Sequence, residues 1–235
     1  MQKGLIMIGI IGAEDEEIAQ IKKYIKINNV SKHQDYTFFE GLIDGKGVVL
    51  LHGGIGKVNA AVATTLLFTH YEIDYVINIG SAGGLYDNQS VGDVVISTAV
   101  VHHDVDITAF GRQLGELPGL PVHFEADPYL CECVCKVLNK MKMSFHSGLM
   151  TSGDQFIASE QQIQKIKKDF PEAICVEMEA AAIAQVCYVF NKKFIITRSL
   201  SDVYEKGKSK MQFDEYLKKA SKVSAKMCYE LILML

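Results

Sequence analysis

Carboxylates stand beside glycine- and serine-rich turns at three separate places in the sequence. Residues 14–17 are Glu-Asp-Glu-Glu, Glu179 lies in Val-Glu-Met-Glu-Ala, and Asp202 ends Arg-Ser-Leu-Ser-Asp. Carboxyl groups gathered in one cleft could divide three tasks: protonating a leaving group, deprotonating a water and accepting hydrogen bonds from substrate hydroxyls. Such a cleft suits an uncharged polyhydroxyl or aromatic substrate.

Each acidic group also has an explanation without catalysis. Acids in the first turn of a helix are stabilised by its dipole by about 0.3–1 kcal/mol, which covers residues 14–17 and Glu179. Asp202 could simply start a turn. Successive helical side chains lie about 100° apart, so only one or two of residues 14–17 can face one cleft. The coincidence of three groups, not any one of them, favours a catalytic site.

Length and charge limit the class of protein. The 235 residues carry 24 basic and 28 acidic side chains, a formal net charge of −4, and no Pro- or Ser-rich linker divides them. We expect a single domain over residues 1–235 that acts on a small molecule, with no nucleic-acid or membrane partner. The apolar N-terminus is interrupted by glycines and runs into acids, unlike a signal peptide, so we expect a cytoplasmic protein.

Cysteine and histidine clusters do not predict a metal site or another cofactor. Cys131, Cys133 and Cys135 form C-x-C-x-C, which lacks the usual spacing of zinc ligands. The better candidate is the His102-His103 pair with Asp104 and Asp106, but one local cluster after a strand is more often a polar loop. We expect all six cysteines to be reduced thiols in this compartment.

Hydrophobic patterning predicts an α/β fold. Short apolar runs at 5–11, 48–51, 75–79, 94–101 and 194–197 alternate with helical patterns at 58–70, 160–169 and 178–189. This order indicates a mixed, largely parallel central sheet covered by helices on both sides, with a hairpin at Asp44-Gly45. The polar turns follow the strands, where open α/β sheets bind ligands, so the three acidic groups should converge on one crevice.

Neither glycine-rich turn is a nucleotide-binding signature. Before Gly56-Lys57, a Walker loop would need glycine where Leu51 stands, and a dinucleotide fingerprint starting at Gly54 would need glycine or alanine at Asn59. Tight strand-to-helix turns explain these glycines equally well, and they permit only a close approach of the backbone to a ligand.

Seven motifs, in order along nearly the whole chain, resemble the bacterial methylthioadenosine/S-adenosylhomocysteine nucleosidases. They are Ile-Gly-Ile-Ile-Gly-Ala at 8–13, Gly-Ile-Gly-Lys-Val at 54–58, Asn-x-Gly-Ser-Ala-Gly-Gly-Leu at 78–85, Asp-Ile-Thr-Ala-Phe-Gly at 106–111, Ser-Gly-Asp-x-Phe-Ile at 152–157, Val-Glu-Met-Glu-Ala at 176–180 and Arg-x-x-Ser-Asp at 198–202. The resemblance implies a nucleoside phosphorylase-like fold and hydrolysis of the bond between adenine and a thio-substituted ribose.

The resemblance also implies a role for each site residue. Asp202, held by Ser201, would protonate adenine, and Glu17 would position and deprotonate the attacking water near Ser81 and Arg198. Glu179 would bind the ribose hydroxyls. The other substrate contacts implied are Phe156 and Ile157 at the base, Met178 at the ribose, Ile55 and Phe213 at the alkylthio group, and Ile107, Phe110 and Pro118 from a partner subunit.

Two positions depart from the family. Glu14 stands where the family usually has methionine, and the stretch 204–212 before Phe213 is about one residue longer. Alternatives within the same fold are an aminodeoxyfutalosine-type nucleosidase and a phosphate-dependent phosphorylase. The phosphorylase would need a multi-arginine phosphate grip, whereas the chain has only Arg112 and Arg198. A non-catalytic nucleoside-binding protein would not need three carboxylates.

A carboxylate at the first strand end would also repel phosphate, by about 4 kcal/mol per pair of unit charges at 4 Å and an effective dielectric of 20. We expect the helix N-terminus to keep Glu17 ionised as the base for water instead. Separately, residues 104–121 carry apolar side chains without helical or strand periodicity, which predicts that this segment lies in a homodimer interface.

Overall fold

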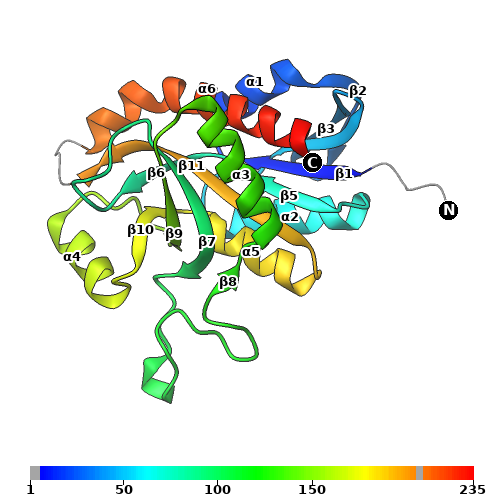
Figure 1. Ribbon diagram of the computed structural model, residues 1–235. Coiled ribbons are helices and arrows are strands. Elements are labelled where there is room, and N and C mark those ends of the chain that lie inside the picture. The colour runs from blue at the N-terminus through cyan, green and yellow to red at the C-terminus, as the bar shows by residue number, and fades with distance from the viewer. Residues whose placement is uncertain (1–5, 205–208) are drawn as a thin grey trace.

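A computed structural model describes residues 6–204 and 209–235, without the side chains of residues 209–215, 217 and 218. Its centre is one mixed sheet in the order β2-β3-β4-β1-β5-β11-β6-β10-β9-β7-β8 (Figure 1). The strands are β1 (Met7–Gly12), β2 (Lys26–His33), β3 (Tyr36–Ile43), β4 (Lys46–His52), β5 (Tyr75–Asn78), β6 (Ser81–Gly84), β7 (Val94–His102), β8 (Phe124–Glu125), β9 (Phe145–Ser152), β10 (Ala173–Glu177) and β11 (Lys193–Val203).

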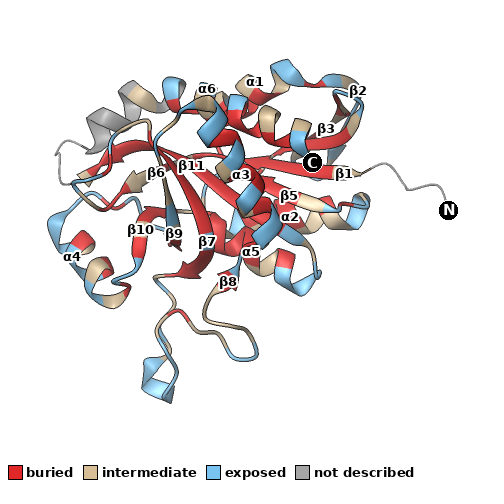
Figure 2. Ribbon diagram, in the orientation of Figure 1, coloured by how far each residue is buried: buried red, intermediate tan, exposed pale blue. Residues whose placement is uncertain are grey.

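Helices cover both faces of this sheet, as the hydrophobic patterning predicts. They are α1 (Asp15–Ile21), α2 (Lys57–His70), α3 (Pro128–Met141), α4 (Glu160–Asp169), α5 (Ala180–Val189) and α6 (Ser209–Met234), with short 3₁₀ turns at Lys22–Tyr24 and Thr108–Phe110. Figure 1 shows α1, α3 and α6 on one side of the sheet and α2 and α5 on the other. The buried strands between these layers form the core (Figure 2).

Part of the sheet closes on itself, which patterning alone does not predict. Strand β11 pairs with β5 and β6 in parallel and also with β7 in antiparallel, so β11, β6, β10, β9 and β7 form a ring. Up to Ile196, β11 pairs with β5; from Thr197, whose Cα is opposite Ile96 of β7, it pairs with β7 and then β6. The apolar run at 194–197 therefore continues as strand to Val203 instead of ending before Arg198.

Local sequence signals explain several element boundaries. Asp44 and Gly45 both have positive φ, at 48° and 82°, and join β3 to β4 as the predicted hairpin. Asp127 caps α3 by accepting the Leu130 N–H at 3.1 Å, followed by Pro128 at the first helical position. Helix α4 spans the predicted residues 160–169, and its capping box pairs Ser159 with Gln162.

Candidate active site

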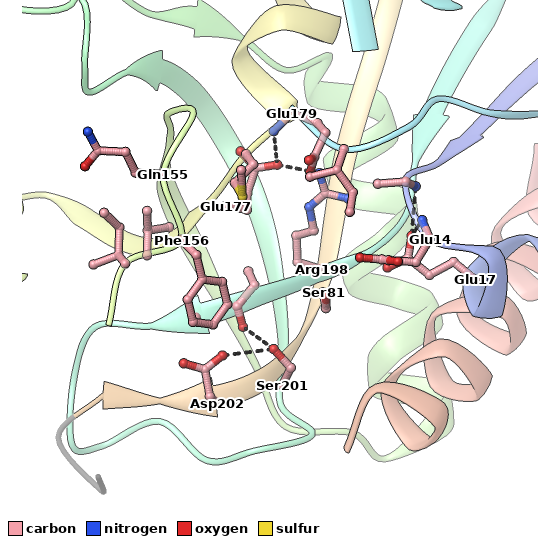
Figure 3. A pocket seen from close by; sticks show the side chains of 17 residues that line it. Glu14, Glu17, Ser81, Gln155, Phe156, Glu177, Glu179, Arg198, Ser201 and Asp202 are labelled. Carbon is pink, nitrogen blue, oxygen red and sulfur yellow. Dashed lines mark hydrogen bonds and ion pairs between the residues drawn. The ribbon is translucent and has the colours of Figure 1, made fainter. Parts of the chain in front are cut away.

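The carboxyl ends of β1, β10 and β11 surround a cavity of about 310 Å³. Its wall contains all three acidic groups that the sequence places at strand ends (Figure 3). The lining residues are Ala13, Glu14, Glu17, Ile55, Ser81, Ala82, Gly83, Gln155, Phe156, Ile157, Val176, Glu177, Met178, Glu179, Arg198, Ser201 and Asp202. The predicted convergence of these groups is therefore confirmed.

Glu17 is the one acid of residues 14–17 that is fully buried. It lies in the first turn of α1, and its Oε2 accepts the backbone N–H groups of Ala13 at 2.9 Å and Glu14 at 3.1 Å. Burial raises the pKa of Glu17, although Arg198 and these two donors oppose the rise. Desolvation is therefore the largest influence on this carboxyl group, an effect that the position of Glu17 at a helix N-terminus does not predict. A raised pKa makes the carboxylate a stronger base.

Arg198 is the central cation of the site, with only 1% of its surface exposed. Its Nη1 donates to the Ile79 carbonyl at 2.8 Å, and its Nη2 lies 2.5 Å from Glu177 Oε2. The same Nη2 is 3.5 Å from Glu179 Oε2. Arg198 therefore links the middle of β11 to the carboxyl end of β10 through buried, charge-assisted contacts.

Glu179 precedes α5 and reaches the turn before α2. Its Oε1 accepts the Gly56 N–H at 2.9 Å, while Oε2 faces Arg198. Burial, and then the charge of Glu177, raise the pKa of Glu179 to about 7, against the opposing effect of Arg198. The glycine-rich turn thus orients a carboxylate instead of a phosphate, with Lys57 held nearby by Asp104 and Asp154.

Asp202 stands on the opposite side of the cavity from Glu14 and Glu17 (Figure 3). Ser201 Oγ lies 3.0 Å from Asp202 Oδ1 and 3.3 Å from the Ala82 carbonyl, so one hydroxyl connects β11 with β6. Phe156 lies over this region with 47% of its surface exposed. A flat aromatic ligand could stack on Phe156 with its edge toward the acid.

Three predicted contacts do not line this cavity, and a fourth lies outside the described side chains. Ile107, Phe110 and Pro118 lie in the long connection between β7 and β8, which Figure 1 shows extending away from the sheet. Phe110 is 84% exposed. Phe213 falls in α6, but its side chain lies outside the part of the chain that the structure describes.

Glu177 and Gln155 line the cavity although we assigned neither a role from the sequence. Glu177 ends a strand two residues before Glu179, and alternation along the strand could have suggested that it faces inward. Glu14 also lines the cavity, and burial followed by the charge of Glu16 raises its pKa.

The two candidate metal clusters make other contacts. His102 Nε2 lies 2.9 Å from Gln185 Oε1, and Asp104 forms an ion pair with Lys57. Burial raises the pKa of Cys131 to about 11, which favours the thiol over the metal-binding thiolate. Within the described residues, no group of three or more such side chains is placed to hold a metal ion.

The charge of the cavity favours water over an anion as the nucleophile. Five carboxyl groups line it, from Glu14, Glu17, Glu177, Glu179 and Asp202. Among the described lining residues Arg198 is the single cation, and Glu177 already binds it. Phosphate would meet buried carboxyl groups without a free cationic partner, whereas ionised carboxylates in the wall would stabilise a cationic transition state.

Comparison with known proteins gives a consistent result. The sequence pattern of the phosphorylase superfamily matches residues 7–233. A 5'-methylthioadenosine/S-adenosylhomocysteine nucleosidase of Staphylococcus haemolyticus (strain JCSC1435) is 46% identical over 229 residues, which cover 97% of this chain and 100% of the relative.

Solved structures agree in fold and length. The nucleosidase of the same kind from Neisseria meningitidis, in complex with methylthio-immucillin-A, has a TM-score of 0.94 and 41% identity, covering 98% of this chain and 100% of that one. A futalosine hydrolase of Helicobacter pylori strain 26695 has a TM-score of 0.92 and 30% identity, covering 98% and 99%.

Proposed function

Because this chain belongs to the phosphorylase superfamily and, within it, to the 5'-methylthioadenosine/S-adenosylhomocysteine nucleosidases, we propose a hydrolytic function for its cavity. The protein hydrolyses the N-glycosidic bond of methylthioadenosine and S-adenosylhomocysteine, and it releases adenine and the thio-substituted ribose. Residues 7–233 match the superfamily as one unit, which supports a single nucleosidase domain over residues 1–235.

The observation that carries this proposal is the placement of buried carboxylates on opposite sides of one cavity. Asp202 acts as the general acid that protonates adenine as it leaves, with Ser201 at 3.0 Å holding the carboxyl group. Phe156 stacks on the base, and the adjacent Ile157 backbone recognises its edge. Departure of neutral adenine leaves an oxocarbenium-like sugar, which the surrounding negative charge stabilises.

Water attacks from the side that Glu17 occupies. Glu17 takes the proton from this water, with Ser81 and Arg198 also lining the wall. Glu179 Oε2, which faces the cavity beside Arg198, accepts hydrogen bonds from the ribose hydroxyls, and Met178 packs on the ribose. Ile55 borders the alkylthio group, together with Phe213. We assign no metal or other cofactor to this reaction.

The test is product analysis with methylthioadenosine, with and without phosphate. We expect adenine and free methylthioribose in both cases at the same rate, because like charges exclude phosphate from the cavity. A rate proportional to phosphate, with a sugar phosphate as product, would instead identify a phosphorylase. Futalosine-type nucleosides belong in the same assay, because the H. pylori structure shares the fold; preferential cleavage of these would reassign the substrate.

A homodimer would complete the pocket. Helices α2 and α5 are apolar on their outer faces as well as their inner ones, with exposed Val58, Val62, Tyr188 and Val189. Figure 1 shows them on the same side of the sheet as the connection that carries Phe110. A second copy on this face would bury these side chains and bring Ile107, Phe110 and Pro118 to the partner's alkylthio site.

We also place the protein in the cytoplasm. All six cysteines are free, and Cys175, Cys187 and Cys228 are buried thiols whose pKa is raised by burial. Reduced thiols are typical of a reducing compartment. In the described residues, no helix is long and apolar enough to cross a membrane.

A further inference from the structure

Glu177 is bound through both of its carboxyl oxygens, yet the proposed reaction gives it no task. Its Oε2 accepts the N–H groups of Glu179 at 3.0 Å and Ala180 at 2.8 Å, in addition to Arg198 Nη2. Its Oε1 accepts from Ser152 Oγ, which itself accepts the Ala181 N–H at 2.8 Å. Both oxygens are therefore held by hydrogen-bond donors from three elements: β9, β11 and the start of α5.

These contacts leave Glu177 little room to serve as a ligand for substrate. Its side chain is 3% exposed, and each oxygen already accepts a strong hydrogen bond. A carboxylate held this firmly can instead fix the position of the group that it binds. That group is Arg198.

Arg198 has two carboxylates within reach of the same nitrogen. Its Nη2 is 2.5 Å from Glu177 Oε2 but 3.5 Å from Glu179 Oε2. Glu179 Oε1 accepts the Gly56 N–H at 2.9 Å, whereas Oε2 has the longer contact with Arg198, so Oε2 keeps more capacity to accept hydrogen bonds from a ligand. A movement of Arg198 toward Glu179 would shorten the existing 3.5 Å ion pair to a direct, charge-assisted hydrogen bond to this oxygen.

We propose that Glu177 is a positioning residue that holds Arg198 away from Glu179 and so keeps Glu179 Oε2 available for the substrate. The identity of the ligand, the ribose hydroxyls, rests on the proposed function. The geometry of Glu177, Arg198 and Glu179 does not. Replacing Glu177 would release Arg198 toward Glu179. The variant would then lose the substrate contact of Glu179, two residues away, in addition to the hydrogen bonds of Glu177.

The charge state of Glu179 reports this movement directly. Glu179 faces Glu177 from β10, Arg198 from β11, Glu17 from α1 and the Gly56 N–H before α2. Burial and Glu177 raise its pKa to about 7, and Arg198 lowers it. Closer approach of Arg198 would stabilise the ionised form and move the titration of Glu179 to lower pH.

Glu177→Asp is the sharpest variant, because it keeps the negative charge but shortens the side chain so that it no longer reaches Arg198. We would follow the ¹³C resonances of labelled glutamate carboxyl groups with pH and assign Glu179 by its loss in Glu179→Gln. The expected result is a titration midpoint lower than in the wild type by about one pH unit or more. An unchanged or higher midpoint would overturn the proposal. The Glu177 charge itself raises the pKa of Glu179, so an equal fall when Glu177→Asp is made in an Arg198→Met background would also overturn it, by assigning the fall to the moved Glu177 charge instead of to Arg198.

Two further variants complete the test. Ser152→Ala removes a hydrogen bond to the other oxygen of Glu177 and should shift the Glu179 midpoint in the same direction by less, even if Glu177→Asp does not fold. Asp93→Asn, which breaks the partly buried contact with His146 at 3.1 Å outside the cavity, is the matched control and should leave the midpoint unchanged.

Activity gives an independent measurement. For methylthioadenosine, Glu177→Asp should lower kcat/KM about 10- to 100-fold, mainly through KM, because a ribose contact is lost. If Arg198→Met is combined with Glu177→Asp, the double variant should be no worse than Arg198→Met alone. If the wild type does not cleave methylthioadenosine, the proposed function fails, whereas the carboxyl titration still decides the role of Glu177.

Discussion

Gly80 leaves the space that the Arg198 guanidinium occupies: a Cβ atom added to Gly80 would lie 2.1 Å from Arg198 Nη1. The Gly80 carbonyl also accepts the Ser199 N–H at 2.9 Å, so the backbone at this point cannot easily move aside. A buried cation can therefore lie beside Glu177 and Glu179 only because residue 80, between β5 and β6, has no side chain.

Gly80→Ala should displace Arg198 and lower kcat/KM for methylthioadenosine by about 10-fold or more, with overpacking that costs about 1–3 kcal/mol of unfolding free energy. Steady-state kinetics and urea unfolding would measure the two effects. Gly47→Ala is a suitable control for activity, because its new Cβ would meet the flexible end of Met7 at 3.0 Å and the Ile6 carbonyl at 3.2 Å, and neither residue lines the cavity. Wild-type activity in Gly80→Ala would show that Arg198 need not occupy this position.

Asp202→Asn should lower kcat about 100-fold or more while adenine affinity changes little, because an amide can hydrogen-bond the base but cannot protonate it. Calorimetry with adenine and turnover of methylthioadenosine would separate binding from chemistry. Ser201→Ala removes the hydroxyl 3.0 Å from the carboxyl group and should cause a smaller loss. Near-normal turnover in Asp202→Asn would show that Asp202 is not the general acid.

Glu17→Gln should abolish most hydrolysis, by about 100-fold or more, because the amide cannot take a proton from water. Inhibitor affinity should be retained. The matched control is Glu16→Gln in the same turn of α1, since Glu16 does not line the cavity. Equal losses in the two variants would point to an effect on the helix instead of on the water.

The ionisation of Glu179 should make stability depend on pH. Burial and the charge of Glu177 raise its pKa from 4.5 to about 7, so between these values the native state binds more protons than the unfolded state. The contribution of Glu179 to stability is complete below pH 4.5 and is lost as pH rises through about 7, by on the order of 3 kcal/mol.

Urea unfolding from pH 5 to 8 would check this sign. Glu179→Gln should flatten the fall in unfolding free energy across this window, and the difference from the wild type isolates Glu179 from Glu17, whose pKa is also raised. The exposed Glu172→Gln serves as control and should keep the wild-type slope. A steeper fall in Glu179→Gln would contradict the assigned direction.

The sequence predicts local structure best where a single strong signal acts. The Asp44-Gly45 turn and the helix at 160–169 were predicted correctly, because their backbone needs are met by adjacent residues. Strand β11 was predicted to end before Arg198. Its polar second half is a strand because it pairs with β6 and β7. Pairing with strands far away in the sequence leaves no hydrophobic periodicity by which this half could be predicted.

The sequence indicated which acids come together at the site, but not how these side chains contact one another. Glu17, Glu179 and Asp202 line one cavity, as their positions at strand ends indicate. The role of Glu177 could not be found in the same way, because it depends on the distance from a guanidinium 21 residues further along the chain. The effect of burial on Glu17 likewise appears only when the whole wall is assembled.

The connection between β7 and β8 leads to a prediction about assembly. Phe110 is 84% exposed at the end of a short 3₁₀ turn, and Ile107 and Pro118 lie in the same connection, away from the cavity of their own chain. We expect Phe110→Ala to weaken dimer association by about 2 kcal/mol or more, about 30-fold, if it is an anchor at the interface. Light scattering over a range of protein concentrations would measure the change.

The same variant separates two ligands. If the partner's Phe110 covers only the alkylthio group, Phe110→Ala should weaken binding of methylthioadenosine more than binding of adenine, because adenine contacts residues of its own subunit such as Phe156 and Asp202. Tyr129→Ala removes another exposed aromatic side chain, from α3 on the opposite side of the sheet, and should change neither association nor affinity. A fully active wild-type monomer, or equal losses for both ligands in Phe110→Ala, would exclude a shared pocket.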